Sequence, residues 1–439
     1  MNLTFNILTT LSARIVTLGL SLISSIVLAR WLGPEGRGVF ALVLLLPGLA
    51  LSLGLLGFDQ ANAVFSGLAP ERRRQLFWHS VAIALGVGCV ITVGGILFVT
   101  LGAPGVGGMV RAPIVLYALA IASVPFRMAS EYWSAILRGM NRIVLLNALE
   151  VGMKVIALSL LALFVLRLGL GVTGAIWADF TLGVGTAVVM VVLLARVEVA
   201  GRPAIDSALW KRTWAFAFPT YCAGVMTYLN YRIDQFIIAA LLPTEALGFY
   251  VIAVDLGERL WILTGAVGTA LLPHLTNSRD RDPALAAVVA RHVMCWTGAA
   301  CLLLLLLADY AVRILYSSAF APAAAALRWL LPGILVLTAG KVVVAELAAR
   351  ERIRFTVWLS AVSIVINIIA NFVLIPSMGI SGAALASTIS YSVVSVVVLR
   401  YYLRETRLPW SVLVPRWSDL SAYAALSRRL GGRGLVTGA

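Results

Sequence analysis

Residues 228–242, YLNYRIDQFIIAALL, place Arg232 and Asp234 two positions apart inside an otherwise apolar run. A charged side chain at the centre of a bilayer costs about 2.5–3.5 kcal/mol on insertion scales, so it is kept only where it faces a bundle interior or a wet cavity. A buried guanidinium suits an anionic ligand, because its fork can hold two phosphate oxygens at once. The stretch therefore predicts a helix that is covered on more than one side and that serves a ligand or an ion.

Helical spacing separates these two charges. Arg232 shares one stripe with Tyr221, Tyr228 and Gln235, at steps of seven, four and three residues. Asp234 lies about 200° round the helix from Arg232, since each residue turns the helix by about 100°. We interpret Arg232 and Tyr228 as facing a cavity in which they bind cargo. We interpret Asp234 as bonded to a neighbouring helix or to a coupling cation.

A second cation lies in the first apolar block. Thr10, Arg14, Thr17, Ser21 and Ser24 recur at steps of four, three, four and three, which places them on one side of a helix. The same block contains no acidic residue that could neutralise Arg14. The stripe predicts a ligand for an anionic cargo, and the alternative is a hydrogen-bond donor between helices.

Three further blocks carry charges at helical spacing, namely Arg127 with Glu131, Glu150 with Lys154, and Asp255 and Glu258 with Arg259. Such pairs neutralise each other within one helix, or they serve the cargo. Asp179 and Lys341 have no such partner nearby in sequence. The predicted substrate-binding residues are Arg14, Arg127, Lys154, Tyr228, Arg232 and Lys341. The predicted coupling or gating residues are Asp179, Asp234, Asp255 and Glu258. We expect no catalytic residue, no metal ligand and no cofactor.

Composition identifies the elements that must position these side chains. The chain has 439 residues, of which 61% are hydrophobic and 12% charged, whereas soluble domains carry about 25% charged residues. Its apolar blocks are continuous over roughly 20 residues, which predicts membrane-spanning helices rather than barrel strands. The net charge is +15, but the sequence contains no hydrophilic segment that could fold as a nucleic-acid-binding domain. We therefore expect no nucleic-acid partner. The four cysteines lie in apolar runs and fit neither a disulfide framework nor a zinc site.

About twelve spans are expected, at 7–29, 39–64, 79–101, 113–137, 143–166, 171–195, 213–241, 248–273, 288–308, 323–347, 355–375 and 380–402. Arginine and lysine concentrate in the loops after even-numbered spans, which predicts that both termini are cytoplasmic. We expect an N-terminal six-helix bundle at 1–200, a C-terminal six-helix bundle at 201–403 and a cytoplasmic tail at 404–439. The tail is expected to form an interfacial amphipathic helix or to be solvated.

The two halves of the chain repeat. LGPEGRGVFAL at 32–42 resembles LLPTEALGFYVI at 241–252, so that Gly38 matches Gly248. LGLGVTGAIWAD at 168–179 matches PSMGISGAALAS at 376–387 at nearly the same offset. Because six spans is an even number, both repeats enter the membrane in the same direction. A pseudo-two-fold axis along the membrane normal is therefore expected, with cargo bound between the halves.

The stretches LARWLGPEGRGVFAL, GFDQAN, RIDQFIIAALLPTEALGFY and ILRGMNRIVLLNALE resemble polysaccharide-export flippases of the multidrug/oligosaccharidyl-lipid/polysaccharide exporter superfamily. The resemblance covers about residues 5–403. It implies two six-helix bundles around a central cavity in the cytoplasmic membrane, and alternating access. It also implies translocation of an undecaprenyl-diphosphate-linked oligosaccharide, with membrane lipid and a coupling cation, proton or sodium, as further partners.

Three alternative functions are compatible with the sequence. A cation-coupled multidrug exporter of the same superfamily would have a similar fold, but an acidic or apolar cavity in place of several unpaired cations. A membrane enzyme of polysaccharide assembly would need a sizeable external loop, and every expected external loop is short. A channel would not require duplicated halves. We therefore expect a transporter rather than an enzyme.

Overall fold

The computed structural model describes residues 3–414 and 416, apart from 102–110, 198, 200, 204–205, 262–264, 266–284 and 350–352. Regular structure in these residues is helical throughout and includes no strand. Nine helices within the described ranges are long and apolar enough to cross a membrane. The all-α membrane fold expected from composition is confirmed.

The N-terminal half contains seven α-helices in its described residues, α1 Leu3–Gly54, α2 Phe58–Leu68, α3 Arg73–Thr100, α4 Ile114–Ala122, α5 Val124–Gly139, α6 Ile143–Leu161 and α7 Gly171–Arg196. The first expected span, 7–29, and most of the second, 39–64, lie in one helix, α1, which changes direction at Gly33. The second span was predicted too long, because α1 ends at Gly54 and residues 58–64 belong to α2. Gly33 has a positive φ of 66°, and Pro34 follows it without a backbone N–H. The fourth expected span is divided between α4 and α5 just before Pro125.

The described C-terminal half contains α8 Ser207–Leu241, α9 Thr244–Glu258, α11 Leu285–Tyr316, α12 Pro322–Ala349, α13 Ile353–Met378 and α14 Ile380–Thr406. Asp206 caps α8, because its carboxylate accepts the backbone N–H groups of Ala208 and Leu209 at 2.9 and 3.1 Å. These donors hold the pKa of Asp206 below its ordinary value. Residues 404–406 belong to α14 rather than to a separate tail. The expected amphipathic face at Trp417 and beyond lies outside the described residues.

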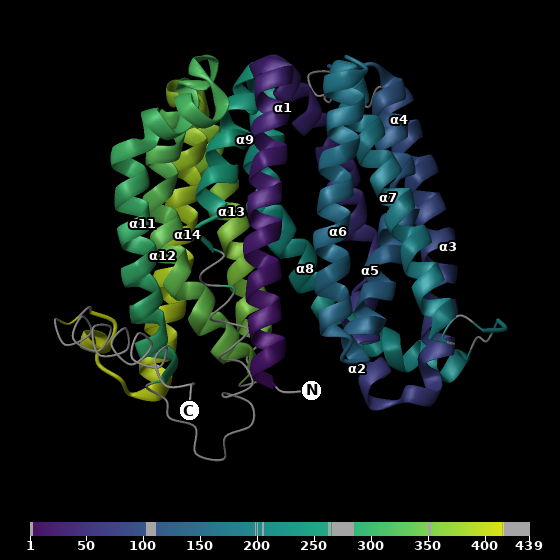
Figure 1. Ribbon diagram of the computed structural model, residues 1–439. Coiled ribbons are helices and arrows are strands. Elements are labelled where there is room, and N and C mark those ends of the chain that lie inside the picture. Colours follow the sequence, from purple (N-terminus) through teal and green to yellow (C-terminus); the bar gives the residue numbers. More distant parts are fainter. Residues whose placement is uncertain are drawn as a thin grey trace, which may run out of the picture.

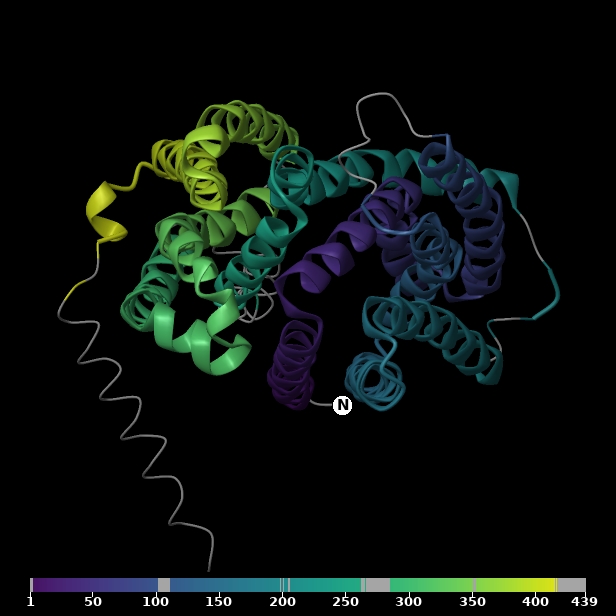
Figure 2. The ribbon, with the colours of Figure 1, turned by 90° about the horizontal axis from the view of Figure 1, so that it is seen from above.

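The helices form two groups, with α2–α7 in one and α9 and α11–α14 in the other (Figures 1 and 2). Helices α1 and α8 lie between them, since α1 packs against both α6 and α9, and α8 packs against both α2 and α13. Helix α1 begins, and α14 ends, at the same end of the molecule (Figure 1). The two-lobed architecture is therefore confirmed. The expected boundary near residue 200 stays a prediction.

Helices α1 and α9 approach so closely that only glycine fits at their crossing. A Cβ atom added to Gly38 would lie 1.9 Å from the carbonyl oxygen of Thr244. A Cβ atom added to Gly248 would lie 2.1 Å from the carbonyl oxygen of Pro34. This backbone contact joins the two groups of helices.

Candidate functional site

Arg232 of α8 forms a two-pronged ion pair with Glu258 of α9. Its Nη1 atom lies 3.0 Å from Glu258 Oε1, and its Nη2 atom lies 3.2 Å from Oε2. The two side chains are 32% and 23% exposed. Sequence spacing assigned Arg232 to cargo and Glu258 to coupling, and the structure brings the two together. An anionic ligand that reaches Arg232 must share this guanidinium with Glu258 or displace Glu258.

Lys341 of α12 lies against aromatic rings and forms no ion pair with a described residue. Its ammonium is 3.2 Å from the ring centroid of Trp261 and 5.0 Å from that of Tyr231. The ring of Tyr391 lies 6.1 Å from each of these two rings. Trp261, Tyr391 and Glu258 also line one narrow crevice that has no room for a water molecule. We call these residues, together with Arg232, the C-lobe cluster.

Asp234 is buried two residues beyond Arg232 on α8 and lines the same crevice. Its carboxylate accepts hydrogen bonds from the Tyr250 hydroxyl of α9, from Ser387 Oγ of α14 at 3.2 Å and from the backbone N–H of Gln235 at 2.7 Å. The expectation that Asp234 is bonded to neighbouring helices is met. Both Arg232 and Asp234 reach α9, however, which their spacing on α8 did not predict.

The polar contacts continue from Asp234 into α13. Asn367 Nδ2 donates to Ser387 Oγ at 3.4 Å and to Ser390 Oγ at 3.2 Å, and Asn371 Nδ2 donates to Asn367 Oδ1 at 2.8 Å. Within the described residues, the buried Oδ1 atom of Asn371 has no hydrogen-bond partner. Our reading of the sequence missed this network. Its signal was the recurrence of Ser363, Asn367 and Asn371 at steps of four along one helical face.

In the N-terminal group of helices, Arg127 of α5 pairs with Asp179 of α7. Arg127 Nη2 lies 2.6 Å from Asp179 Oδ2, and Arg127 Nε donates to Ser123 Oγ at 3.1 Å. The expected pair of Arg127 with Glu131 is not formed. Side chains on a helix lean toward its N-terminus, so Arg127 extends back toward Ser123 and α7 rather than forward to Glu131. Asp179, which has no partner in its own helix, supplies the neutralising charge.

The other two expected pairs within a helix have different outcomes. Asp255 of α9 and Arg259, the residue that follows this helix, form one at 2.7 Å, and Asp255 also accepts a hydrogen bond from the hydroxyl of Ser25 in α1 at 2.6 Å. Glu150 and Lys154 are both exposed, and no ion pair joins them in the described part of the chain. Asp255 is thus a contact between α9 and α1, the two helices that cross at Gly38.

Arg14 lies on α1 between the two groups of helices. Its Nη1 atom would lie 3.0 Å from a Cβ atom added to Gly265. No hydrogen bond or ion pair of its guanidinium is found among the residues that the structure describes. One turn earlier, Thr10 accepts a hydrogen bond from Asn147 of α6 at 3.0 Å. The polar side of α1 that carries Thr10 and Arg14 therefore faces α6. The facing side of α6 carries Asn147 and, two turns later, Lys154.

Tyr228 holds α8 against α1. Its hydroxyl donates to the carbonyl oxygen of Leu45 at 3.3 Å and lies beside Gly48, where an added Cβ atom would be only 2.5 Å away. The predicted residues therefore fall in three places: the C-lobe cluster with Asp234 beside it, the Arg127–Asp179 pair, and the region around α1 and α8. In this last region Arg14 and Tyr228 lie on α1 and α8 themselves, and Lys154 and Asp255 lie on α6 and α9, which pack against α1. Within the described ranges, no three His, Cys, Asp or Glu side chains gather as a metal site would require.

Comparison with solved structures supports the same architecture. The lipid II flippase MurJ in an inward closed conformation superposes with a TM-score of 0.74 at 13% identity, over 93% of this chain and 89% of that one. The Vibrio cholerae MATE transporter VcmN gives 0.65 at 14% identity, over 92% and 95%. A transporter of the MOP superfamily from Pyrococcus furiosus gives 0.63 at 17% identity, over 92% and 95%. These likenesses establish the fold alone, which is that of multi-pass membrane transporters.

Sequence comparison adds a family. A putative O-antigen transporter of Shigella flexneri is 23% identical over 273 residues, which are 58% of this chain and 62% of the relative. The match thus spans less than two thirds of that curated relative. The model of the polysaccharide biosynthesis protein family matches residues 3–278, which is more than half of the chain. The protein is a multi-pass membrane protein that belongs to the polysaccharide biosynthesis protein family.

Proposed function

We propose that this protein is a flippase that moves an oligosaccharide linked to undecaprenyl diphosphate across the cytoplasmic membrane by alternating access. The family supports a role in polysaccharide biosynthesis, and the Shigella flexneri relative bears the name of an O-antigen transporter. The observation that carries the proposal is the Arg14 guanidinium, which lies between the lobes and forms no ion pair with a described residue. A cation between two lobes that forms no ion pair with the described residues suits a cargo that brings its own negative charge.

The proposed mechanism follows from the cost of moving a diphosphate through hydrocarbon. Arg14 and Lys154 would replace part of its hydration as the head group enters between the lobes, because they supply charge-assisted donors. Arg232 would join only when the cargo competes with Glu258 for its fork. The diphosphate of the cargo would thereby replace the Glu258 carboxylate as the anion bound to Arg232. Because Glu258 belongs to α9, this exchange would link cargo binding to the position of α9.

We propose Asp234 as the site that couples transport to a proton or sodium ion. Of the four acids expected to couple or gate, Asp179, Asp255 and Glu258 each pair with an arginine. The described partners of Asp234 are instead hydroxyl groups and a backbone N–H. Oxygen atoms are the ligands that hard cations take, and Asn371 Oδ1 is a further buried oxygen in the same network. The three paired acids would act as gates.

The orientation is also a proposal. Both termini are placed on the cytoplasmic side, on the basis of the arginine-rich loops. Reporter fusions after Ser207 and after Ala439 should both give a cytoplasmic signal. An external signal from either fusion would overturn the orientation.

A cation-coupled multidrug exporter is the second candidate, and one observation bears on it. The rings of Tyr231, Trp261 and Tyr391 form the kind of aromatic cage that accepts organic cations. Lys341 already occupies the face of two of these rings. A cationic drug would have to displace a covalently attached cation, so the cage favours the flippase over the drug exporter.

Complementation tests the proposed function. The full chain should restore surface polysaccharide display in a cell whose own flippase gene is deleted, without raising its resistance to ethidium. Restored display would support a flippase, whereas ethidium resistance without display would support the drug exporter. A membrane enzyme of polysaccharide assembly would be revealed by polysaccharide synthesis in lysed membranes, where no translocation is required.

A further inference from the structure

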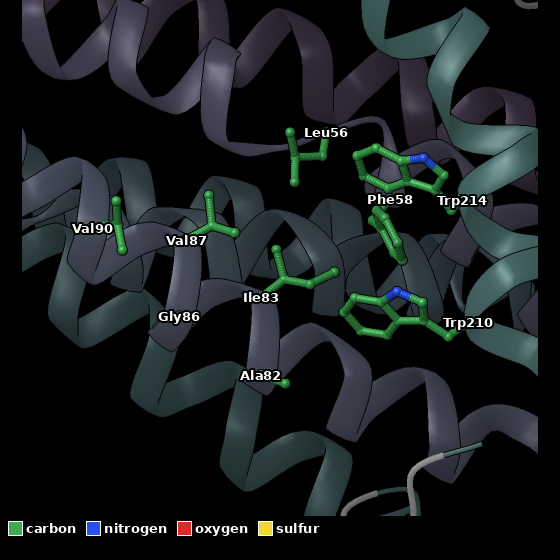
Figure 3. A pocket seen from close by; sticks show the side chains of 9 residues that line it. All are labelled: Leu56, Phe58, Ala82, Ile83, Gly86, Val87, Val90, Trp210 and Trp214. Atoms are coloured by element: carbon green, nitrogen blue, oxygen red, sulfur yellow. The ribbon is translucent and has the colours of Figure 1, made fainter. Parts of the chain in front are cut away.

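An elongated apolar cavity of about 290 Å³ lies between α2, α3 and α8 (Figure 3). It is separate from every charged residue discussed so far. Only hydrocarbon and ring atoms face it, from Leu56, Phe58, Ala82, Ile83, Gly86, Val87, Val90, Trp210 and Trp214. Such a lining can bind only the apolar part of a ligand.

The two ends of this cavity differ. The rings of Phe58, Trp210 and Trp214 gather at one end, with centroids 5.4 and 5.8 Å apart, and Val87 and Val90 lie at the other end (Figure 3). Val90 is 17 residues beyond Arg73, the first residue of α3, which is about 25 Å along the helix. Tryptophan is enriched where membrane meets water. The cavity therefore extends from the first turns of α8 toward the middle of the bilayer.

The cavity is open toward the membrane. Val90 at its far end is 72% exposed. Gly86 contributes no side chain, and a Cβ atom added there would have no heavy atom within 4 Å. A hydrocarbon chain could enter sideways from the bilayer without any rearrangement of the protein.

One exposed cation lies beside the aromatic end. Lys211 comes directly after Trp210 and is exposed, and it lies about 60° round α8 from Trp214, because each residue turns the helix by about 100°. Arg212 lies about 200° from Trp210 by the same rule, and its guanidinium is 5.5 Å from the ring centroid of Phe65 on α2. An occupant that complements this surface has an apolar chain and an anionic head at the tryptophan end.

We propose that this cavity binds part of the polyprenyl tail of the lipid carrier, with its diphosphate against Lys211. This proposal rests on the proposed function and deepens it, because it gives the tail a place on the protein. Helix α8 also carries Tyr228 and Arg232 further along its length. The carrier therefore docks on the first turns of the helix whose later turns reach the C-lobe cluster, before its head group enters between the lobes.

A filled-cavity variant tests the proposal on the purified full chain in detergent. Gly86→Phe places a ring in the cavity, and Gly94→Phe is its matched control, since Gly94 lies on the same helix and also has no heavy atom within 4 Å of an added Cβ. Gly86→Phe should weaken binding of both undecaprenol and undecaprenyl diphosphate by about tenfold, because it removes roughly two methylene groups of apolar contact or more. Gly94→Phe should leave both affinities unchanged.

A second pair of measurements addresses the head group. Lys211→Ala should weaken binding of undecaprenyl diphosphate several-fold and leave binding of the uncharged undecaprenol unaffected. Equal binding by Gly86→Phe and by the unaltered protein would overturn the proposal. So would displacement of undecaprenol by vesicles of palmitoyl-oleoyl-phosphatidylglycerol at comparable lipid concentration, because the cavity would then be a general phospholipid site. Failure of the proposed function is distinguishable, since polyprenyl binding would persist while polysaccharide display was not restored.

Discussion

Arg232 and Glu258 bridge α8 and α9 through two parallel N–H···O contacts of 3.0 and 3.2 Å. The pair lies beside a crevice that excludes water and next to the Lys341 ammonium on its aromatic rings. Removing one member would leave the other charged and uncompensated among apolar helices. The pair therefore holds α8 and α9 together. An anionic cargo must break the pair in order to bind Arg232.

Glu258→Gln should destabilise the protein and at the same time free Arg232 for cargo. Breaking a buried pair costs about 3–5 kcal/mol, and partial exposure of both side chains reduces the expected loss to about 1–3 kcal/mol. Thermal unfolding in detergent would measure the loss. Undecaprenyl diphosphate should bind Glu258→Gln more tightly than the unaltered protein, and weaker binding would contradict the competition between Glu258 and cargo.

Arg14→Ala should fold normally and lose polysaccharide export. Among the described residues the guanidinium forms no hydrogen bond or ion pair whose loss would destabilise the fold. A charge-assisted contact with cargo is worth about 1.5–3 kcal/mol, which corresponds to a ten- to hundredfold change in affinity. Arg14→Lys should recover part of the activity, since it keeps the charge without the fork. Surface display with protein quantified by blot is the measurement. The control is Arg400→Ala, which removes an exposed arginine near the end of α14.

If Arg14→Ala exports normally at normal abundance, the cationic mechanism between the lobes is wrong. If the variant does not accumulate while Arg400→Ala does, Arg14 is a donor between helices instead.

Asp234→Asn should abolish the dependence of export on the ion gradient while cargo binding remains measurable. The substitution preserves volume and removes the negative charge that a cation would neutralise. Export would be followed in membrane vesicles with and without an imposed proton or sodium gradient. Asp309→Asn serves as the control, because Asp309 pairs with Arg328 at 2.6 Å on an exposed surface. A stable Asp234→Asn protein that still responds to the gradient that drives the unaltered protein would exclude Asp234 from coupling.

Gly38→Ala and Gly248→Ala should each lower the thermal stability of the full chain, because the added Cβ atom would meet a carbonyl oxygen at about 2 Å. Gly19→Ala, on the same α1 helix with no heavy atom within 4 Å of the added Cβ, should instead raise stability by about 0.5–1 kcal/mol, as alanine does in helix interiors. Opposite signs at positions 19 and 38 would confirm the close crossing. Similar changes at both positions would contradict it.

The sequence predicted the features that depend on neighbouring residues. Apolar blocks long enough to span a bilayer are a local property, so the expected spans fall on helices of the structure. Their ends were predicted less well, since the first two spans share α1 and the fourth is divided between α4 and α5. Asp255 and Arg259, four residues apart, form the pair that their spacing permits. Pairs between helices were not accessible in this way, because the partner of Arg232 lies 26 residues away and that of Arg127 lies 52 residues away.

Cavities were less predictable still. The apolar cavity depends on the absence of a side chain at Gly86 and on rings from α2 and α8 that meet only in the folded molecule. In the sequence, Gly86 is one glycine among 38. Its significance depends on which helix faces it, and a single sequence does not encode that in any local pattern.

The crossing of α1 and α9 has the form of a dimer contact. Gly38 meets Thr244 and Gly248 meets Pro34, and each residue of one contact is 210 positions from its counterpart in the other. Two identical surfaces related by a two-fold axis contact each other in this reciprocal way. A single six-span ancestor could therefore have formed this contact with a second copy of itself before duplication joined the two. After the fusion, a Cβ atom at either glycine would harm both halves, so neither copy can accept a larger residue independently of the other.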